Sequence, residues 1–287
     1  MNSAIFVSSS CVNNSRIAQS VKMLADQGFT NIELSGGTNL YPEWKAELIA
    51  LKSELGLTYR CHNYFPPPKE HFVLNLSSHD KLERRRSIEH VLNVIELSNE
   101  LEAPVYGIHA GFRLQPDTNK LGKAFTNVAL QPENEAIELF AAAWEKVNDR
   151  AIEHGVKLYV ENNVLSAANH KTFTQGNPFL ATDSVSIKKL QKATGAPLLL
   201  DIAHLKVSCN SLGLSFENEL KTLVAQSDYL HFSDNNGMAD TNHGLHKDTE
   251  VFKLLESVAL KNKTITLEVY DGTLQESYES TAALLNS

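Results

Sequence analysis

Several short apolar runs in this sequence end in a side chain that can bind a metal or move a proton. These end residues are His62 after TYRC, His109 after VYGI, Glu161 after KLYV, Asp201 after APLLL, His231 after Tyr229-Leu230, and Glu268 after TITL. Each run is typical of a buried parallel strand, and each polar residue falls at its carboxyl end. If the strands form a closed barrel, these side chains converge at one mouth, where barrel enzymes place their active sites.

A shared divalent cation is the chemistry that this convergence favours. Carboxylates crowded in one low-dielectric mouth repel one another unless a cation neutralises them. Carboxylate oxygens mixed with imidazoles suit Mn, Zn, Co, Mg or Fe, and no cysteine belongs to the set, which argues against a structural zinc site. The alternative is a set of independent structural roles, since a lone Asp after a strand often caps the next helix.

Other polar residues near these strand ends have two interpretations each. Glu33 ends a further strand and either orients a substrate or ligand histidine or is a buried structural carboxylate. Asn162 and Asn163 either donate hydrogen bonds to a substrate or cap their turn. Arg113 and Lys206 are candidates to meet an anion, and the loop after His231 carries Asp240 and His243.

Strands and helices alternate along almost the whole chain. The strands are expected at 4–7, 31–34, 58–62, 105–109, 157–161, 197–201, 229–232 and 264–268, and the helices at 16–27, 44–55, 81–101, 134–154, 185–194, 216–226, 251–260 and 275–285. Long loops are expected after His109 and in 169–184. Apolar strands such as Leu198-Leu199-Leu200 indicate burial on both faces, hence a parallel sheet.

The pattern therefore predicts an α/β protein with a single (β/α)8 TIM barrel over residues 1–287. A doubly wound open sheet is the alternative, but Ser8-Ser9-Ser10-Cys11 is not the glycine-rich phosphate loop that such a sheet usually carries after its first strand.

Composition limits the class of partner. The chain has 26 Lys and Arg against 34 Asp and Glu, a net charge of −8, and no extended basic block, which disfavours a nucleic-acid partner. The three cysteines are widely spaced and indicate reduced thiols. No run approaches the roughly 20 apolar residues that span a bilayer, and the first residues lack the features of a signal peptide. We expect a cytoplasmic protein without a membrane partner.

The chain resembles the xylose isomerase-like barrel superfamily, which includes sugar and sugar-phosphate isomerases and epimerases and the endonuclease IV group. The segments that carry the resemblance are Tyr106-Gly107-Ile108-His109-Ala110-Gly111, Val160-Glu161-Asn162, Leu200-Asp201-Ile202-Ala203-His204, Leu230-His231-Phe232-Ser233-Asp234 and Leu267-Glu268. In the epimerase branch the resemblance implies one divalent metal held by Glu161, Asp201, His231 and Glu268, with His204 on the substrate.

The nuclease branch implies two further metals, at positions that look like His62, His109, His204 and an Asp and His after the seventh strand. Its Asp and His are two residues apart, whereas Asp240 and His243 are three apart, which leaves this pair in question. His62, His109, His204 and His243 are therefore candidates either for substrate binding or for additional metal.

The leading hypothesis is a metal-dependent isomerase or epimerase of a small sugar or sugar derivative. Glu161 and Glu268 would remove and return a proton through an enediolate, as the general base and acid. The alternatives are an endonuclease IV-like multi-metal phosphodiesterase, a barrel that binds a sugar without turnover, and related lyase chemistry. The substrate's phosphorylation stays open, and the fold is compatible with a homo-oligomer.

Overall fold

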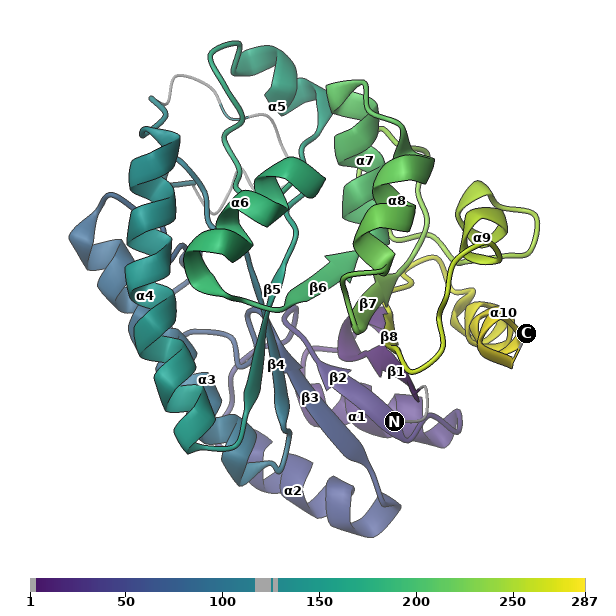
Figure 1. Cartoon of the computed structure of the whole chain (residues 1–287). Coiled ribbons are helices and arrows are strands. Elements are labelled where there is room, and N and C mark those ends of the chain that lie inside the picture. The colour runs from purple at the N-terminus through teal and green to yellow at the C-terminus, as the bar shows by residue number, and fades with distance from the viewer. Residues whose placement is uncertain (1–3, 117–124, 126–128, 287) are drawn as a thin grey trace.

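Eight parallel strands close into a barrel in sequence order, as the sequence predicts (Figure 1). The computed structural model describes residues 4–116, 125 and 129–286; part of the loop expected after His109 lies outside these ranges. Neighbouring strands pair in parallel throughout, and the last pairs with the first. The strands are β1 (Ala4–Ser8), β2 (Asn31–Leu34), β3 (Thr58–His62), β4 (Val105–His109), β5 (Lys157–Glu161), β6 (Leu198–Asp201), β7 (Tyr229–Phe232) and β8 (Thr264–Leu267).

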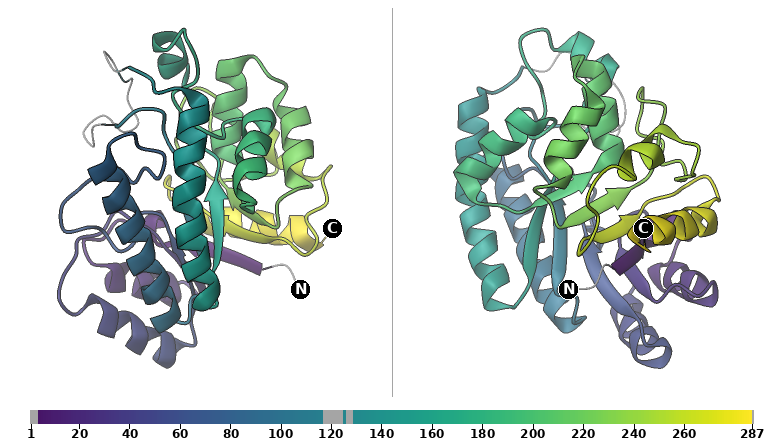
Figure 2. Two further views of the ribbon diagram at one scale, coloured as in Figure 1. Left: turned by 60° about the vertical axis from the view of Figure 1, so that its left-hand side comes forward. Right: turned by 45° about the vertical axis from the view of Figure 1, so that its right-hand side comes forward.

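Helices surround the strands on the outside of the barrel, which the turned views in Figure 2 show from two further sides. They are α1 (Ile17–Asp26), α2 (Trp44–Leu55), α3 (Lys81–Glu100), α4 (Glu133–Glu153), α5 (Ala167–Thr172), α6 (Ser184–Thr194), α7 (Ile202–Leu212), α8 (Phe216–Val224), α9 (Glu250–Leu255) and α10 (Leu274–Asn286), with a 3₁₀ turn η1 (Ser9–Cys11) after β1. Within the described ranges, none of them combines the length and the apolar character needed to cross a bilayer.

The expectation of one helix after each strand is wrong in two places. Two helices, α5 and α6, follow β5, and α5 lies in a segment that the sequence analysis treats as loop. Two helices, α7 and α8, also follow β6, and α7 begins directly after the strand with no connecting loop. The start of α7 has a local cause, because Asp201 Oδ1 accepts the backbone N–H of His204 at 2.7 Å and so caps the helix.

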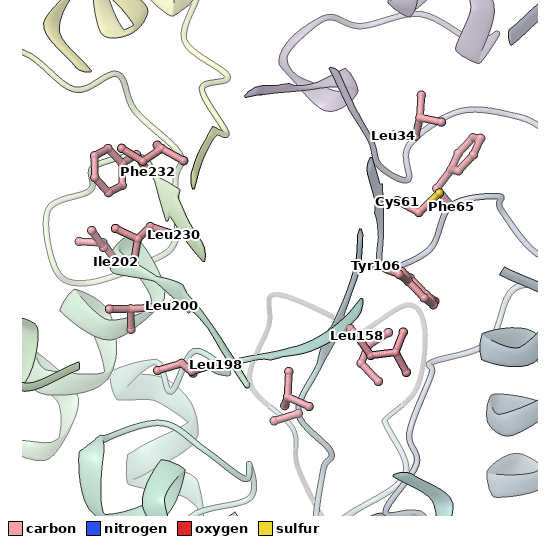
Figure 3. Packing of buried hydrophobic residues seen from close by; sticks show 14 of the residues in the cluster. Leu34, Cys61, Phe65, Tyr106, Leu158, Leu198, Leu200, Ile202, Leu230 and Phe232 are labelled. Atoms are coloured by element: carbon pink, nitrogen blue, oxygen red, sulfur yellow. The ribbon is translucent and has the colours of Figure 1, made fainter. Parts of the chain in front are cut away.

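Alternation along the strands separates the apolar core from the barrel interior. Successive side chains of a strand point to opposite faces, so in β6 Leu198 and Leu200 face the helices while Leu199 faces inward. Figure 3 shows Leu198, Leu200, Leu230 and other core side chains around the outside of the strand ring. Leu199 instead packs with Tyr159 and Tyr229 in a separate interior cluster.

Packed side chains fill the barrel interior below its carboxyl end. The Arg60 guanidinium lies 4.3 Å from the ring centroid of Phe6 and 4.6 Å from that of Tyr229. Tyr229 in turn meets Tyr159 edge to face, with centroids 5.2 Å apart. These contacts fix the inward side chains from below, so the polar residues one step further along each strand stand on a rigid base.

We predict that His90 on α3 makes the fold less stable in mild acid. Burial, with a smaller contribution from Arg86, lowers the pKa of His90 to about 4, and its Nε2 has no hydrogen-bond partner among the described residues. The unfolded chain takes up a proton near its ordinary pKa of 6.5, whereas the folded chain resists it until about pH 4. Stability is therefore lost as pH falls through this window, by up to about 3 kcal/mol.

The test compares urea unfolding of the wild type and His90→Leu at pH 7 and pH 5. The variant should lose less free energy of unfolding between the two pH values. If the two proteins lose the same amount, His90 does not cause the acid sensitivity.

Candidate functional site

Glu161 stands at the centre of a buried polar cluster at the carboxyl ends of the strands. Its Oε2 lies 2.9 Å from His62 Nε2 and 3.2 Å from His109 Nδ1, and its Oε1 lies 3.2 Å from His231 Nδ1. These side chains come from β5, β3, β4 and β7. The convergence that the sequence predicts at the mouth is therefore present for this part of the set.

His231 lies between carboxylates from both sides of the barrel. Its Nε2 is 3.0 Å from Glu33 Oε1, and its Nδ1 is 3.9 Å from Asp201 Oδ2 and 3.8 Å from Glu268 Oε2. The other oxygen of Glu33 accepts a hydrogen bond from Thr266 Oγ1 at 2.9 Å. Glu33 Oε1 and His231 Nε2 are at ion-pair distance but share no aligned hydrogen bond, so the geometry fits both interpretations of Glu33, a structural carboxylate and one that orients the imidazole.

Asp201 does two things at once. Its Oδ1 caps α7, while its Oδ2 is buried and has no hydrogen-bond partner among the described residues. Glu161 Oε1 and His231 Nδ1 are likewise buried without hydrogen-bonded partners, although they lie close to each other. Glu161, Asp201 and His231 offer ligand atoms that lie within 4.8 Å of one another, as do two neighbouring groups, Glu33 with His62 and His231, and His62 with His109 and Glu161.

The loop after β7 brings Asp240, and not His243, to the cluster. Asp240 Oδ2 lies 3.2 Å from His204 Nε2, while His204 Nδ1 donates to the backbone carbonyl of Asn162 at 2.9 Å. The His243 backbone pairs with Asp234 in both directions at 2.8 Å. Asn242, which has a left-handed backbone conformation with φ of 48°, is buried, and His243 is exposed.

Asp240 is the cluster residue that the sequence analysis leaves out of its candidate set. The spacing of two residues in the nuclease pattern could have found it, since it pairs Asp240 with Asn242 and not with His243. Asn242 Oδ1 accepts a hydrogen bond from Ser233 Oγ at 3.0 Å. The hydrogen-bonded amide of Asn242 therefore occupies the position at which the nuclease pattern has a histidine.

Asn162 and Asn163 serve the backbone. The Asn162 side chain accepts from the N–H of Asp201 at 2.7 Å and donates to its carbonyl at 3.0 Å, which fixes the end of β6 beside the end of β5. Asn163 Nδ2 donates to the carbonyls of Ala110, Gly111 and Leu180. The interpretation of both residues as turn-stabilising is the one that these contacts fit.

The electrostatics of the cluster split its carboxylates into two kinds. Burial raises the pKa of Glu161, but His109, His62 and His231 outweigh it and hold that pKa well below the ordinary value. Burial raises the pKa of Asp201 to about 7, and it also raises the pKa of Glu268. Among the described residues, the ion pairs of these carboxylates are with histidines, and neither Lys nor Arg forms one with them.

The histidines also differ. Burial disfavours the charge of His204, but Asp201 and Asp240 raise its pKa well above the ordinary value. Burial likewise opposes the charge of His231, yet Glu33, Glu268 and Glu161 raise its pKa well above 6.5. Burial lowers the pKa of His109 to about 4, so this imidazole is neutral at pH 7 and has a lone pair to offer a cation or a hydroxyl group.

A cavity of about 880 Å³ opens over this cluster. His62, His109, His204, Asp240 and Glu268 form its floor, and polar groups such as Ser10, Ser35, Thr38 and Asn39 form one wall. Tyr64, Pro67, Pro68 and Phe72 also line the cavity, and the Tyr270 hydroxyl lies 3.1 Å from Ser10 Oγ. The volume is typical of a pocket for a small molecule.

Comparison with known proteins agrees with the barrel. Similar solved structures include a D-tagatose 3-epimerase-like protein (19% identity, TM-score 0.69, 100% of this chain and 96% of that chain) and an L-ribulose 3-epimerase (19%, 0.64, 98% and 86%). A 3-keto-D-glucoside 4-epimerase from E. coli is similar at 12% identity and TM-score 0.67, with 99% and 100% covered. At these identities the likeness shows the fold alone, and a search of curated proteins finds no match.

A sequence-family model supplies the remaining comparison. The model described as xylose isomerase-like TIM barrel matches residues 21–287, which is most of the chain and includes the cluster residues described above. Since the match agrees with both the strand order and the resemblance at the strand ends, the chain belongs to the xylose isomerase-like TIM-barrel family.

Proposed function

We propose that this protein is a divalent-metal-dependent epimerase or isomerase of a small sugar. The observation that carries the proposal is that Glu161 and Glu268 reach the same buried histidine, His231, from β5 and from the end of β8, beneath a cavity of sugar-accommodating size. Two carboxylates flanking one reacting carbon are what proton removal and return require. The similar structures that carry the names of sugar epimerases support this choice.

The residues present fit a divalent ion. Glu161 Oε1, Asp201 Oδ2 and His231 Nδ1 are buried, lack hydrogen-bond partners among the described residues, and converge on one point. With Glu268 they form the set Glu161, Asp201, His231 and Glu268, whose hard oxygens and single imidazole suit Mn, Zn, Co or Mg. When bound, such an ion would supply Lewis-acid stabilisation for the negative charge that develops on the substrate's oxygens.

The protein's own residues then divide the work. One of Glu161 and Glu268 removes a proton from a carbon next to the carbonyl, and the other delivers a proton. Delivery to the opposite face of the same carbon gives an epimer, and delivery to the neighbouring carbon gives an isomer. His204, held by the Asn162 carbonyl and Asp240, steadies a substrate hydroxyl or oxyanion, and Glu33 keeps His231 in orientation.

The substrate that this cavity favours is uncharged. Among the described residues, no Lys or Arg lines it. Arg113 donates to the carbonyls of Gln131 and Asn177, and Lys206 pairs with Asp234 and Glu250. Neither candidate is therefore available to neutralise a phosphate, and the charged or titratable groups of the described lining that a phosphate would meet are carboxylates, histidines and tyrosines.

A multi-metal phosphodiesterase is the second candidate, and one observation favours it. His62, His109 and Glu161 form a further group of ligand atoms within 4.8 Å, beside the first. The absence of basic side chains from the described cavity wall and the amide at Asn242 disfavour it, since a nuclease has to clamp a phosphate. Metal stoichiometry separates the two candidates.

We predict that the protein freed of metal by a chelator binds one Mn²⁺ per chain tightly. Asp201→Asn should weaken that binding about 100-fold or more, because it removes a charged ligand. His71→Asn is the control: His71 lines the cavity but belongs to none of the ligand groups, so the affinity should change by no more than about threefold. Isothermal titration with MnCl₂ and elemental analysis give affinity and stoichiometry. Three tightly held ions would favour the hydrolase, and no binding would contradict both readings.

We predict that Glu161→Gln slows carbon-bound hydrogen exchange about 100-fold or more. The Mn²⁺-loaded enzyme would be incubated with D-tagatose and D-fructose in D₂O, and loss of the signals of hydrogens next to the carbonyl would be followed by NMR. Glu89→Gln, on an exposed face of α3, is the matched control and should exchange like the wild type. Exchange retained in Glu161→Gln would remove Glu161 from the proton-transfer step, and no exchange by the wild type would count against the proposed reaction.

A further inference from the structure

A second hollow of about 290 Å³ adjoins the cavity over the cluster. Four residues line both of them: Tyr64, His109, His204 and Asp240. We call the second hollow the aromatic chamber, because the apolar part of its remaining lining consists of Phe112, Phe125, Val164, Phe179 and Ala239. Asn163, Ser166 and Asn169 complete that lining. The reacting end of a molecule at His109 and His204 therefore has room to continue in two directions.

The aromatic chamber is a built feature of the loops that follow β4 and β5. The backbone of Phe112 and Phe179 forms an antiparallel bridge, with Arg113 N–H donating to Pro178 and Leu180 N–H to Gly111 at 2.8 and 3.0 Å. The rings of Phe112 and Phe179 meet edge to face at 5.6 Å. This arrangement presents ring edges and faces at fixed positions, as aromatic recognition requires.

The two hollows differ in chemistry. The larger one has hydroxyl and amide groups, and two of its lining residues, Thr38 and Asn63, carry buried oxygens without hydrogen-bond partners among the described residues. A buried oxygen without a partner is costly, so it favours a ligand with hydroxyl groups. The aromatic chamber belongs instead to a hydrophobic cluster that is separate from the main core and that also contains Val73, Leu114, Leu165 and Phe173.

We propose that the substrate is an uncharged keto-glycoside, a glycoside with a ketone at one carbon of its sugar ring, that carries an aromatic substituent. The sugar lies over the cluster, where the carbon next to the ketone loses its proton, and the aromatic ring enters the aromatic chamber. The proposal rests on the sugar chemistry proposed above. A cavity of about 150 Å³ lined by apolar side chains is enough to hold benzene, so 290 Å³ accommodates a substituted phenyl ring. A free monosaccharide would leave this apolar surface in contact with water, and burying a ring there is favourable.

The test measures binding of phenyl and methyl D-glucopyranosides, in both anomers, to the Mg²⁺-loaded enzyme by ligand-observed NMR titration. These glucosides lack the ketone, so they bind without reacting. For at least one anomer, the phenyl compound should bind about tenfold more tightly or better, in keeping with burial of one aromatic side chain. Val164→Phe fills the chamber from its partly exposed wall and should reduce this preference to about twofold or less, with the affinity for the methyl glucoside unchanged.

Phe173→Leu is the matched control, because Phe173 belongs to the same hydrophobic cluster but does not line the chamber. It should keep the preference for the phenyl compound. Equal binding of phenyl and methyl glucosides, binding of neither, or a preference that survives Val164→Phe would overturn the proposal. The readout is binding, so it is independent of the exchange assay. Exchange on free ketohexoses without a preference for the phenyl compound would contradict the role of the aromatic chamber and leave the proposed reaction standing. A preference for the phenyl compound without exchange would contradict the proposed reaction and leave the chamber standing.

Discussion

The constraint on which this site depends is the concentration of acidic groups in a buried place where, among the described residues, no Lys or Arg forms an ion pair with them. Glu33, Glu161, Asp201, Asp240 and Glu268 share one mouth, and among the described residues their close charged partners are histidines. Imidazoles offset this charge only when protonated: the pKa values of His204 and His231 are raised by the carboxylates around them, whereas burial lowers the pKa of His109 to about 4 and keeps it neutral at pH 7. A divalent cation, as proposed above, would neutralise two of these charges and would be held by the oxygens that lack hydrogen bonds.

The barrel creates this situation through the period of its strands. Leu198, Leu200 and the equivalent residues of the other strands face the helices. The last inward-facing residue of each strand therefore lies at the mouth of the barrel, whichever side chain it carries. Arg60, Tyr159 and Tyr229 occupy the level below and close the interior. The apolar core, which packs outside the strand ring, thus stabilises the fold. The fold can therefore tolerate a polar cluster inside the ring whose own contribution to folding stability is unfavourable.

The same period explains what could be predicted from the sequence. Strand ends such as Glu161 and His231 are fixed by an apolar run, so their convergence follows once a closed barrel is assumed. Asp240 and His243 lie in a loop, where which side chain faces inward depends on the backbone pairing of His243 with Asp234, and no periodicity marks that pairing. The start of α7 is also not marked by periodicity, because Asp201 both ends β6 and caps the helix. The aromatic chamber depends on the pairing of Phe112 with Phe179, which lie in two loops far apart in the sequence.

Glu161 connects the competing interpretations of the site. Its Oε1 faces His231 and Asp201, while its Oε2 faces His62 and His109. In the one-ion proposal, Glu161, Asp201, His231 and Glu268 would hold the ion, and Glu161 would also serve as a base beside His62 and His109. In the multi-metal alternative, His62, His109 and Glu161 would hold a further ion, and Glu161 would then be unavailable to take up a proton. The two proposals therefore make opposite demands on this one carboxylate.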